Sequence, residues 1–178
     1  MKRLMVYVVS KFTLIILVTY FFSEYLFASH VRAQSANTGY MRHDSSLGAP
    51  TDKRIGGLVV RAHELIGTRY RWGGASVSQG FDCSGLLFYL FRNEAGINIP
   101  RTTTSMLNSK AETVERDKLK VGDAVFFKHN GGQRMNHVGL YIGNGRFIHS
   151  PRTGKTIRID SLNNTYWKQS YHTAKRFH

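Results

Sequence analysis

Cys83 is the one cysteine of this 178-residue chain, and two interpretations of it compete. Its neighbours, Asp82 before it and Ser84 and Gly85 after it, are polar or small, and a helix is expected to begin here. Backbone N–H groups and the dipole at a helix start favour the thiolate, which is the nucleophilic form of cysteine. A free cysteine is also a common small core residue. The residue is therefore a nucleophile or an inert part of the core, and a single cysteine provides neither a disulfide framework nor a cysteine-based zinc site.

A nucleophilic cysteine needs a base, and the base needs a group that orients it. Among the eight histidines, His137 and His149 stand out because they lie in two predicted strands that flank one hairpin. Singly, each is more often a satisfied polar side chain, but a facing pair would supply a base and its orienter. A metal site is the competing use of two neighbouring histidines. No carboxylate or third ligand lies close by in sequence, so we expect no metal and no other cofactor.

The register of this hairpin decides whether the two histidines face each other. A three-residue loop over 143–145 would pair Ile142 with Arg146 and set both imidazoles on one face, with Cβ atoms at most about 7–8 Å apart. A two-residue turn would direct them to opposite faces. Gly145 suits the left-handed position that the longer loop requires, and Gly139 would leave room for the imidazoles. We therefore predict the three-residue loop.

The elements that must position these residues are helices first and short strands after them, which is the α+β pattern. Apolar residues at helical spacing, glycines at the helix ends and a change to short β-rich runs after Gly122 define them. We predict helices over 51–66 and 83–95, a loop over 68–80, a short turn or helix over 100–106, and strands over 124–128, 137–142, 146–150, 156–159 and 171–177.

Composition limits the class of protein and its partners. A chain of this length with 42% hydrophobic residues is expected to hold one folded domain with a real core. The formal net charge of +14 favours a polyanionic partner such as nucleic acid, acidic lipid or an acidic cell envelope. Charge alone does not choose among these partners.

The N-terminal segment predicts export. Residues 1–33 have a basic start, an uncharged apolar run over 12–22 and small residues before Ala33, which is the layout of a cleaved signal peptide. The competing interpretation is a retained membrane anchor over 5–27, which Lys11 and Glu24 interrupt. We expect a flexible linker over 34–50 and a catalytic domain over 51–178. Export makes the cell envelope, in the periplasm or outside it, the expected location, and nucleic acid is not an expected partner.

Six motifs in this order resemble the NlpC-type cell-wall cysteine peptidases. The match extends over nearly all of residues 51–177, and the motifs are YRWGG at 70–74, FDCSGL at 81–86, IPRT at 99–102, LKVGDAVFF at 119–127, HVGLYIGNG at 137–145 and FIH at 147–149. The resemblance implies a papain-like α+β fold, with N-terminal helices packed on a central antiparallel sheet. It also implies a peptidoglycan endopeptidase that cuts murein stem peptides or their cross-links, at bonds that involve diaminopimelate.

The resemblance assigns roles to particular residues. Cys83 matches the nucleophile, His137 the base and His149 the third, orienting residue of the family's triad, which works through an acyl-enzyme. Tyr70 matches a tyrosine beside the nucleophile and, with the Cys83 backbone N–H, is expected to stabilise the oxyanion. Other candidate oxyanion or substrate-binding residues are Asp82, Ser84, Arg71 and Arg101; Arg71, Arg101 and Arg152 are candidates for the carboxylates of stem peptides, or else solvated surface arginines.

The ending over 166–176 looks most like the murein endopeptidases of Gram-negative bacteria. A monomer without an added targeting domain is expected, so that the catalytic domain itself would bind the wall. Two other functions remain open. The domain could be a papain-like acyltransferase or amidase that acts on envelope substrates, or a basic wall-binding module without catalysis.

Overall fold

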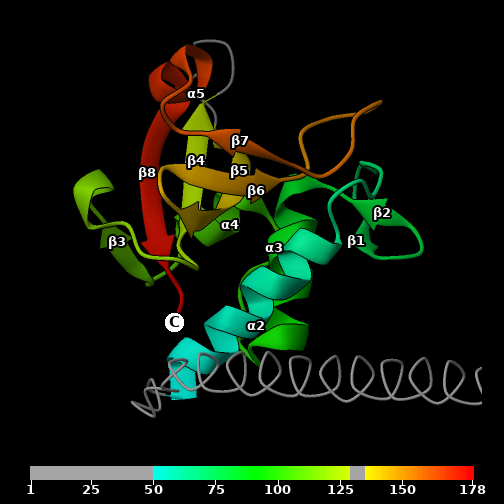
Figure 1. Ribbon diagram of the computed structural model, residues 1–178, viewed down its shortest axis with the longest axis horizontal. Helices are drawn as coiled ribbons and strands as arrows, with labels where there is room; N and C mark the ends of the chain where they lie inside the picture. Colours follow the sequence, from blue (N-terminus) through cyan, green and yellow to red (C-terminus); the bar gives the residue numbers. More distant parts are fainter. Residues whose placement is uncertain (1–49, 129–134) are drawn as a thin grey trace, which may run out of the picture. The chain divides into compact units, whose positions relative to one another are not determined.

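An antiparallel sheet lies at the centre of the fold, with helices packed around it (Figure 1). The computed structural model describes residues 50–128 and 135–178. In chain order its elements are α2 (Pro50–Glu64), β1 (Ala75–Ser76), β2 (Gly80–Phe81), α3 (Cys83–Glu94), α4 (Thr103–Leu107), β3 (Glu112–Val114), the 3-10 turn η2 (Arg116–Lys118), β4 (Ala124–Lys128), β5 (Met135–Gly143), β6 (Arg146–His149), β7 (Arg158–Ser161), α5 (Thr165–Ser170) and β8 (Tyr171–Arg176).

The six strands of the sheet have the order β3-β8-β4-β5-β6-β7, and a separate small sheet pairs β1 with β2. The α+β class and the helices packed on an antiparallel sheet are confirmed. Three differences concern short elements: β1 and β2 lie inside the predicted loop over 68–80, β3 and α5 were not predicted, and β7 begins two residues later than the predicted strand. Strands of two or three residues are too short to show a periodic pattern.

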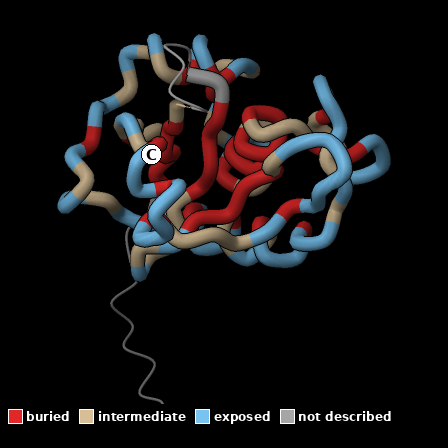
Figure 2. Tube along the Cα trace, turned by 90° about the horizontal axis from the view of Figure 1, so that it is seen from above, coloured by how far each residue is buried: buried red, intermediate tan, exposed pale blue. Residues whose placement is uncertain are grey.

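The sheet carries an apolar cluster on each face, because side chains alternate between the two faces of a strand. Strand β4 shows this alternation. Ala124 and Phe126 belong to the cluster that includes buried residues of α2 and α3, whereas Val125 and Phe127 belong to the cluster that contains Trp167 of α5. Figure 2 shows the buried positions gathered in the interior and the exposed ones in the surrounding loops. The histidine strands are therefore held by packing on both sides.

The β5–β6 hairpin sets its two histidines on one face, as predicted, but its turn differs from the predicted one. Asn144 and Gly145 both have positive φ, of 53° and 68°, as a two-residue type I′ turn requires, and Gly143 pairs with Arg146. The predicted three-residue loop and the pairing of Ile142 with Arg146 are therefore wrong. A register shift between Tyr141 and Gly143 restores the even register nearer the histidines, where Leu140 pairs with Ile148 and Tyr141 with Phe147.

A glycine is needed at position 139 for a different reason from the predicted one. A Cβ atom added at Gly139 would lie 2.6 Å from the Phe147 ring and 3.2 Å from the carbonyl of Ile148. The glycine therefore makes room for Phe147, and not directly for the imidazoles. Phe147 in turn packs against His149, with ring centroids 4.9 Å apart.

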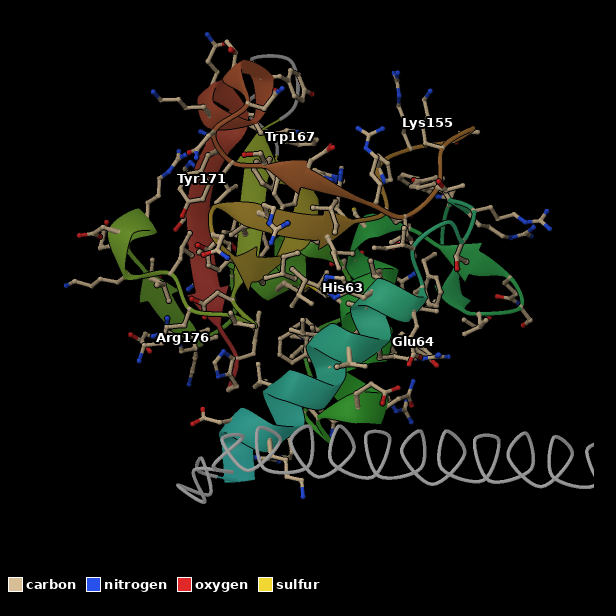
Figure 3. All side chains as sticks on the ribbon, viewed as in Figure 1. His63, Glu64, Lys155, Trp167, Tyr171 and Arg176 are labelled. Carbon is tan, nitrogen blue, oxygen red and sulfur yellow. The ribbon has the colours of Figure 1, made fainter. Side chains whose placement is uncertain are left out.

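A buried ion pair joins the last residue of β8 to the residue that precedes β4. The Asp123 side chain is fully buried, and Arg176 of β8 donates to its two carboxylate oxygens at 2.8 and 2.7 Å (Figure 3 labels Arg176). Burial raises the pKa of Asp123, but contacts with His178, Arg176 and the Lys120 N–H outweigh that effect and lower it. The carboxylate is thus held ionised inside the protein by its partners.

We expect Arg176→Ala to destabilise the fold by about 3 kcal/mol, because it leaves a buried carboxylate without its main partner. The free energy of unfolding in urea measures the effect. Arg146→Ala removes an exposed arginine from the same sheet and serves as the control, with a change below about 0.5 kcal/mol. Equal losses in the two variants would contradict the role of the buried pair.

The N-terminal predictions concern residues outside the described ranges. The signal peptide or anchor over 1–33 lies outside them, and so does the linker over 34–50 except for its last residue, Pro50, which begins α2. Within residues 50–128 and 135–178, no helix is long and apolar enough to cross a membrane.

Candidate active site

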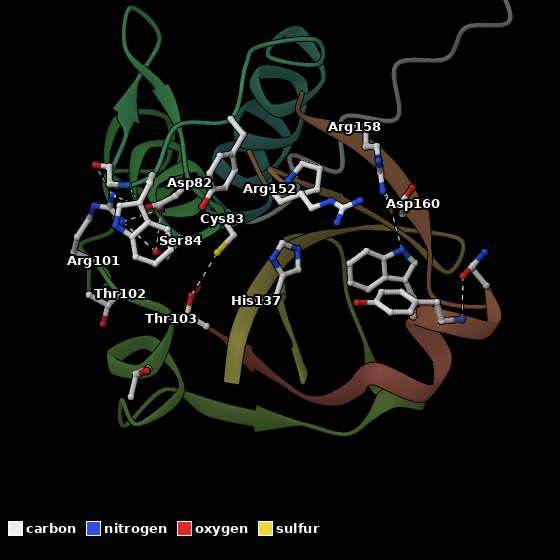
Figure 4. Close-up of a pocket in the computed structure, with 18 residues that line it drawn as sticks. Asp82, Cys83, Ser84, Arg101, Thr102, Thr103, His137, Arg152, Arg158 and Asp160 are labelled. Atoms are coloured by element: carbon white, nitrogen blue, oxygen red, sulfur yellow. Dashed lines mark hydrogen bonds and ion pairs between the residues drawn. The ribbon is translucent and has the colours of Figure 1, made fainter. Parts of the chain in front are cut away.

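Cys83 lies at the first position of α3 and lines a cleft of about 1200 Å³ (Figure 4). Its sulfur is 3.7 Å from the Thr103 hydroxyl of α4. The sulfur also lies within hydrogen-bonding reach of the backbone of Val138, the residue that follows His137 in β5. The thiol therefore lies between the start of α3 and β5, the strand that carries the candidate base. That base, His137, lines the same cleft.

Burial raises the pKa of the Cys83 thiol, and the nearby Asp82 carboxylate raises it further. Hydrogen bonds with Thr103 and with the backbone of Val138 and Ser84 act in the opposite direction. The start of the helix does favour the thiolate, through the backbone of Ser84, but the burial of the sulfur outweighs this effect. A thiol with a raised pKa needs a nearby base to accept its proton.

His137 and His149 lie on the same face of the sheet, as predicted, and share a hydrogen bond. His137 Nε2 is 2.7 Å from His149 Nδ1, and both side chains are buried. The Trp167 indole stacks on the His137 ring, with centroids 5.5 Å apart, and meets the His149 ring edge-on at 5.0 Å. Phe127 and Phe147 complete this aromatic surrounding. The packing holds both imidazoles in one orientation.

Asp160 of β7 lies behind the histidine pair and was not singled out from the sequence. Its Oδ2 accepts hydrogen bonds from His149 Nε2 at 2.9 Å, from Trp167 Nε1 at 2.9 Å, and from Arg158 Nε and Nη2 at 3.1 and 2.9 Å. Burial raises the pKa of Asp160, but the bonds and charges of His149 and Arg158 outweigh it and lower the pKa to about 2. The carboxylate is therefore ionised at neutral pH.

Three predicted substrate-binding residues, Asp82, Ser84 and Arg101, form one cluster beneath the start of α3. Arg101 donates to both carboxylate oxygens of Asp82 and to the Ser84 hydroxyl, at 3.0 Å each. It also donates to the carbonyls of Gly73 and Gly74, at 3.0 and 3.2 Å. Since its guanidinium is occupied by the protein, this geometry favours a positioning role for Arg101 over the binding of a substrate carboxylate.

Asp82 organises the chain on both sides of the nucleophile. Its Oδ1 accepts from the Gly85 N–H at 2.6 Å, which caps α3, and from the Ser84 hydroxyl at 3.1 Å. Its Oδ2 accepts from the Gly73 N–H at 3.0 Å. One carboxylate thus ties the start of α3 to the loop that follows Tyr70.

The remaining predicted residues differ in their positions. Tyr70 lines the cleft, and burial, together with the charges of Cys83 and Asp82, raises the pKa of its hydroxyl, so that it keeps its proton and can donate. Arg152 is exposed and also lines the cleft. Arg71 is exposed but is not among the residues that line it.

No set of three or more His, Cys, Asp or Glu side chains in the described part of the chain is arranged to hold a metal ion. His137, His149 and Asp160 instead form a line in which each side chain contacts the next. Such a line suits the orientation of imidazoles, because a metal needs ligands that converge on one point.

The rule that located the histidine pair also locates Asp160. Strand β6 pairs with β7 through His149 and Arg158, so Asp160 is the diagonal neighbour of His149 on the same face. The predicted strand over 156–159 ended one residue too early to include Asp160. Trp167 lies within the C-terminal ending over 166–176, and its contacts depend on α5, a helix of six residues.

A cysteine at a helix start, set against a histidine pair on an antiparallel sheet, defines a papain-like fold, and comparison with known proteins identifies its family. The NlpC/P60 family model matches residues 67–176. The chain belongs to the NlpC/P60 family. The family resemblance predicted from the motifs is confirmed.

Several curated relatives match the same region. The chain is 50% identical over 114 residues to "Murein DD-endopeptidase MepH" of Escherichia coli, which covers 64% of this chain and 42% of that protein. It is 41% identical over 110 residues to "Murein DD-endopeptidase MepS/Murein LD-carboxypeptidase" of Escherichia coli, over 62% and 56% of the two chains. It is 38% identical over 120 residues to "Gamma-DL-glutamyl hydrolase" of Bacillus subtilis, over 67% and 29%. The matched region thus covers between 29% and 56% of the length of each of these relatives.

Solved structures agree on the fold. A structure of an NlpC/P60 family protein from Bacillus cereus has a TM-score of 0.64 at 34% identity and covers 69% of this chain and 40% of that chain. The NlpC/P60 domain of the peptidoglycan hydrolase SagA has a TM-score of 0.59 at 30% identity and covers 68% and 97%. The papain-like α+β fold is therefore shared with structures of the same family.

Proposed function

We propose that this protein is a peptidoglycan endopeptidase that hydrolyses amide bonds of murein stem peptides with Cys83 as its nucleophile. The observation that carries the proposal is the line of contacts that leads from the cleft inward, with Cys83 against β5 and His137 bonded to His149. The names of the relatives support the substrate, since they include two murein endopeptidases. No metal or organic cofactor enters the proposed reaction.

The reaction begins with transfer of the Cys83 proton to His137. Because His137 Nε2 is engaged with His149, Nδ1 is the ring nitrogen that exchanges a proton with the thiol. The resulting thiolate attacks the carbonyl carbon of the scissile amide, and a C–S bond forms. His137 then gives its proton to the leaving nitrogen as the C–N bond breaks.

Water completes the reaction on the acyl-enzyme. His137 takes a proton from the water, whose oxygen attacks the thioester carbon. The C–S bond then breaks, and the sulfur takes that proton from His137, which returns the Cys83 thiol and releases a carboxylic acid. The backbone N–H of Cys83 and the protonated hydroxyl of Tyr70 are the donors that we assign to the oxyanion. His149 orients His137 and stabilises its charged form.

We propose the D-alanyl–diaminopimelate cross-link as the bond, because the relative named MepH is a DD-endopeptidase with 50% identity. The alternative is the γ-D-glutamyl–diaminopimelate bond within one stem, and the name of the Bacillus subtilis hydrolase favours that kind of bond at 38% identity. Mass spectrometry of purified peptidoglycan digested with the protein separates the two. Cross-linked dimers converted to intact monomers support the first, and truncated stems support the second. Added amine acceptors that appear in the products would indicate an acyltransferase instead.

We also propose that the protein acts in the cell envelope after export and binds the wall through its basic surface. Arg69, Arg71, Arg152 and Lys155 are exposed, and the described contacts include no ion pair for any of them. Their two segments lie side by side, because Arg69 bridges to Thr156 and the Tyr70 N–H donates to the Lys155 carbonyl at 2.9 Å. We call these four residues the basic rim; Figure 3 labels Lys155, and Arg152 also lines the cleft.

We expect binding of the protein to intact sacculi to weaken as salt rises, because charge attraction at an exposed surface is screened over about 8–10 Å at physiological ionic strength. The double variant Arg69→Gln/Lys155→Gln should weaken binding and flatten this salt dependence. Lys53→Gln/Arg92→Gln removes the same charge from exposed positions on α2 and α3 and is the control. Cosedimentation with sacculi at several salt concentrations measures the effect. Salt-independent binding would assign the affinity to shape or apolar contacts.

A further inference from the structure

The hydrogen bonds of Asp160 fix which nitrogen of each histidine carries a proton. An ionised carboxylate has only acceptors, so the His149 nitrogen that contacts Asp160, Nε2, must carry a hydrogen and donate it. In a neutral imidazole the other nitrogen then has the lone pair. For His149 this nitrogen is Nδ1, which faces His137.

The constraint passes from His149 to His137. Since His149 Nδ1 can only accept, His137 Nε2 must donate across the 2.7 Å contact. The lone pair of neutral His137 is then on Nδ1, the nitrogen that exchanges a proton with Cys83 in the proposed reaction. Without an acceptor at the position of Asp160, His149 could carry its hydrogen on Nδ1, and His137 would then present a hydrogen instead of a lone pair to the thiol.

The position of the carboxylate is itself held from three sides. Trp167 of α5, Arg158 of β7 and His149 of β6 all donate to the same oxygen, Oδ2. The charged or titratable groups that affect Asp160 are His149 and Arg158, and both favour its ionised form. The Trp167 ring also stacks on His137, so the same side chain orients the carboxylate and the base.

We propose that Asp160 is a positioning residue for this reaction, which sets the tautomers of His149 and His137 and so makes His137 Nδ1 the base. This inference rests on the proposed function of the cleft. It adds a fourth residue behind the proposed triad. Its contribution comes through His149, because Asp160 contacts neither His137 nor Cys83 in the described hydrogen bonds.

The direct test is ¹⁵N NMR of the histidine side chains in the full-length protein at neutral pH. We expect both His149 and His137 to carry their hydrogen on Nε2 in the wild type. Asp160→Leu removes the acceptor, and a population with the hydrogen on Nδ1 should then appear for His149. A wild-type His149 with its hydrogen on Nδ1 would overturn the proposal without any variant, and it would leave the assignment of Cys83 as nucleophile intact.

Kinetics on a soluble cross-linked muropeptide supply the second readout. We expect Asp160→Leu, the variant without an acceptor, to lower kcat by about 10–100-fold, the usual range for a residue that orients a ligand or base from behind, with KM changed by less than about threefold. The loss of negative charge should also move the acid limb of the pH profile to lower pH, because a protonated histidine pair loses its stabilising partner.

Asp123→Leu is the matched control, because Asp123 is likewise a carboxylate that binds an arginine but lies outside the cleft lining. It should lower the thermal midpoint and leave kcat of the folded protein within about twofold, as expected for a change far from the reacting groups. A kcat of Asp160→Leu within twofold of the wild type would overturn the proposal. So would an equal loss of kcat in the two aspartate variants, since that would assign the effect to stability.

Discussion

Cys83→Ala is expected to abolish turnover, with a loss on the order of 10⁶-fold in kcat, because removal of a nucleophile leaves only the residual catalysis of binding and oxyanion contacts. Within this chain no second thiol can replace it. Release of soluble muropeptides from purified sacculi measures the loss. Thermal unfolding should show a folded variant, since alanine is a good helix former at the first position of α3.

The double variant Cys83→Ala/His137→Ala should be no slower than Cys83→Ala alone, because triad members act as a unit. Alkylation of the wild type provides a matched chemical test, since Cys83 is the only possible site for a thiol reagent in this chain. Wild-type release by Cys83→Ala, together with a bound metal whose loss abolishes activity, would replace the thiol mechanism with a metal hydrolase.

His137→Ala is expected to lower kcat by roughly 10⁴–10⁶-fold, because the thiol loses the group that accepts its proton and the leaving nitrogen loses its proton donor. The raised pKa of Cys83 makes this dependence stronger, since a buried thiol ionises poorly without a base. His63→Ala is the control, because His63 is exposed on α2 and its hydrogen bond within the described residues is local, with the Val59 carbonyl at 2.9 Å. Activity of His137→Ala near that of His63→Ala would contradict the assignment of the base.

Loss of His149, the proposed orienting residue, should lower kcat less than loss of His137, the proposed base. His149→Ala should lower kcat by roughly 10³-fold, because orientation is lost while His137 remains. With the tautomers that we propose, a replacement must supply one acceptor toward His137 Nε2 and one donor toward Asp160. Asn and Gln side chains hold both groups, so His149→Asn or His149→Gln should recover part of the loss. A variant without an acceptor, such as His149→Leu, should show no recovery.

The larger elements could be predicted because each has a pattern long enough to read. Helix α3 has buried apolar residues at Leu86, Leu87, Leu90 and Phe91, and Gly96 with its positive φ follows its end. Strand β4 agrees with its predicted bounds residue for residue. Strands of two or three residues, such as β1 and β3, have no period to detect, and the six residues of α5 make fewer than two helical turns.

The residues of the site also divide into those that the sequence predicts and those that it does not. Motifs locate Cys83, His137 and His149, because the residue types themselves carry the chemistry. The sequence could not predict the contacts of Arg101. Its guanidinium binds Asp82 and two carbonyls of a loop that lies 27 and 28 residues away in the chain. Asp160 was missed because the predicted strand over 156–159 ended one residue before it and the pairing of that strand with β6 was not predicted.

The register shift at Ile142 separates the length of the hairpin tip from the facing of its histidines. In a regular hairpin the turn length alone sets the parity of every cross-strand pair, so a two-residue turn would place His137 and His149 on opposite faces. Here a two-residue turn and one extra residue in β5 together produce the parity that a three-residue loop would produce alone. Two different tips are thus equivalent for the cleft. A tip lengthened by one residue can leave the histidines in place if the irregularity in β5 is removed at the same time.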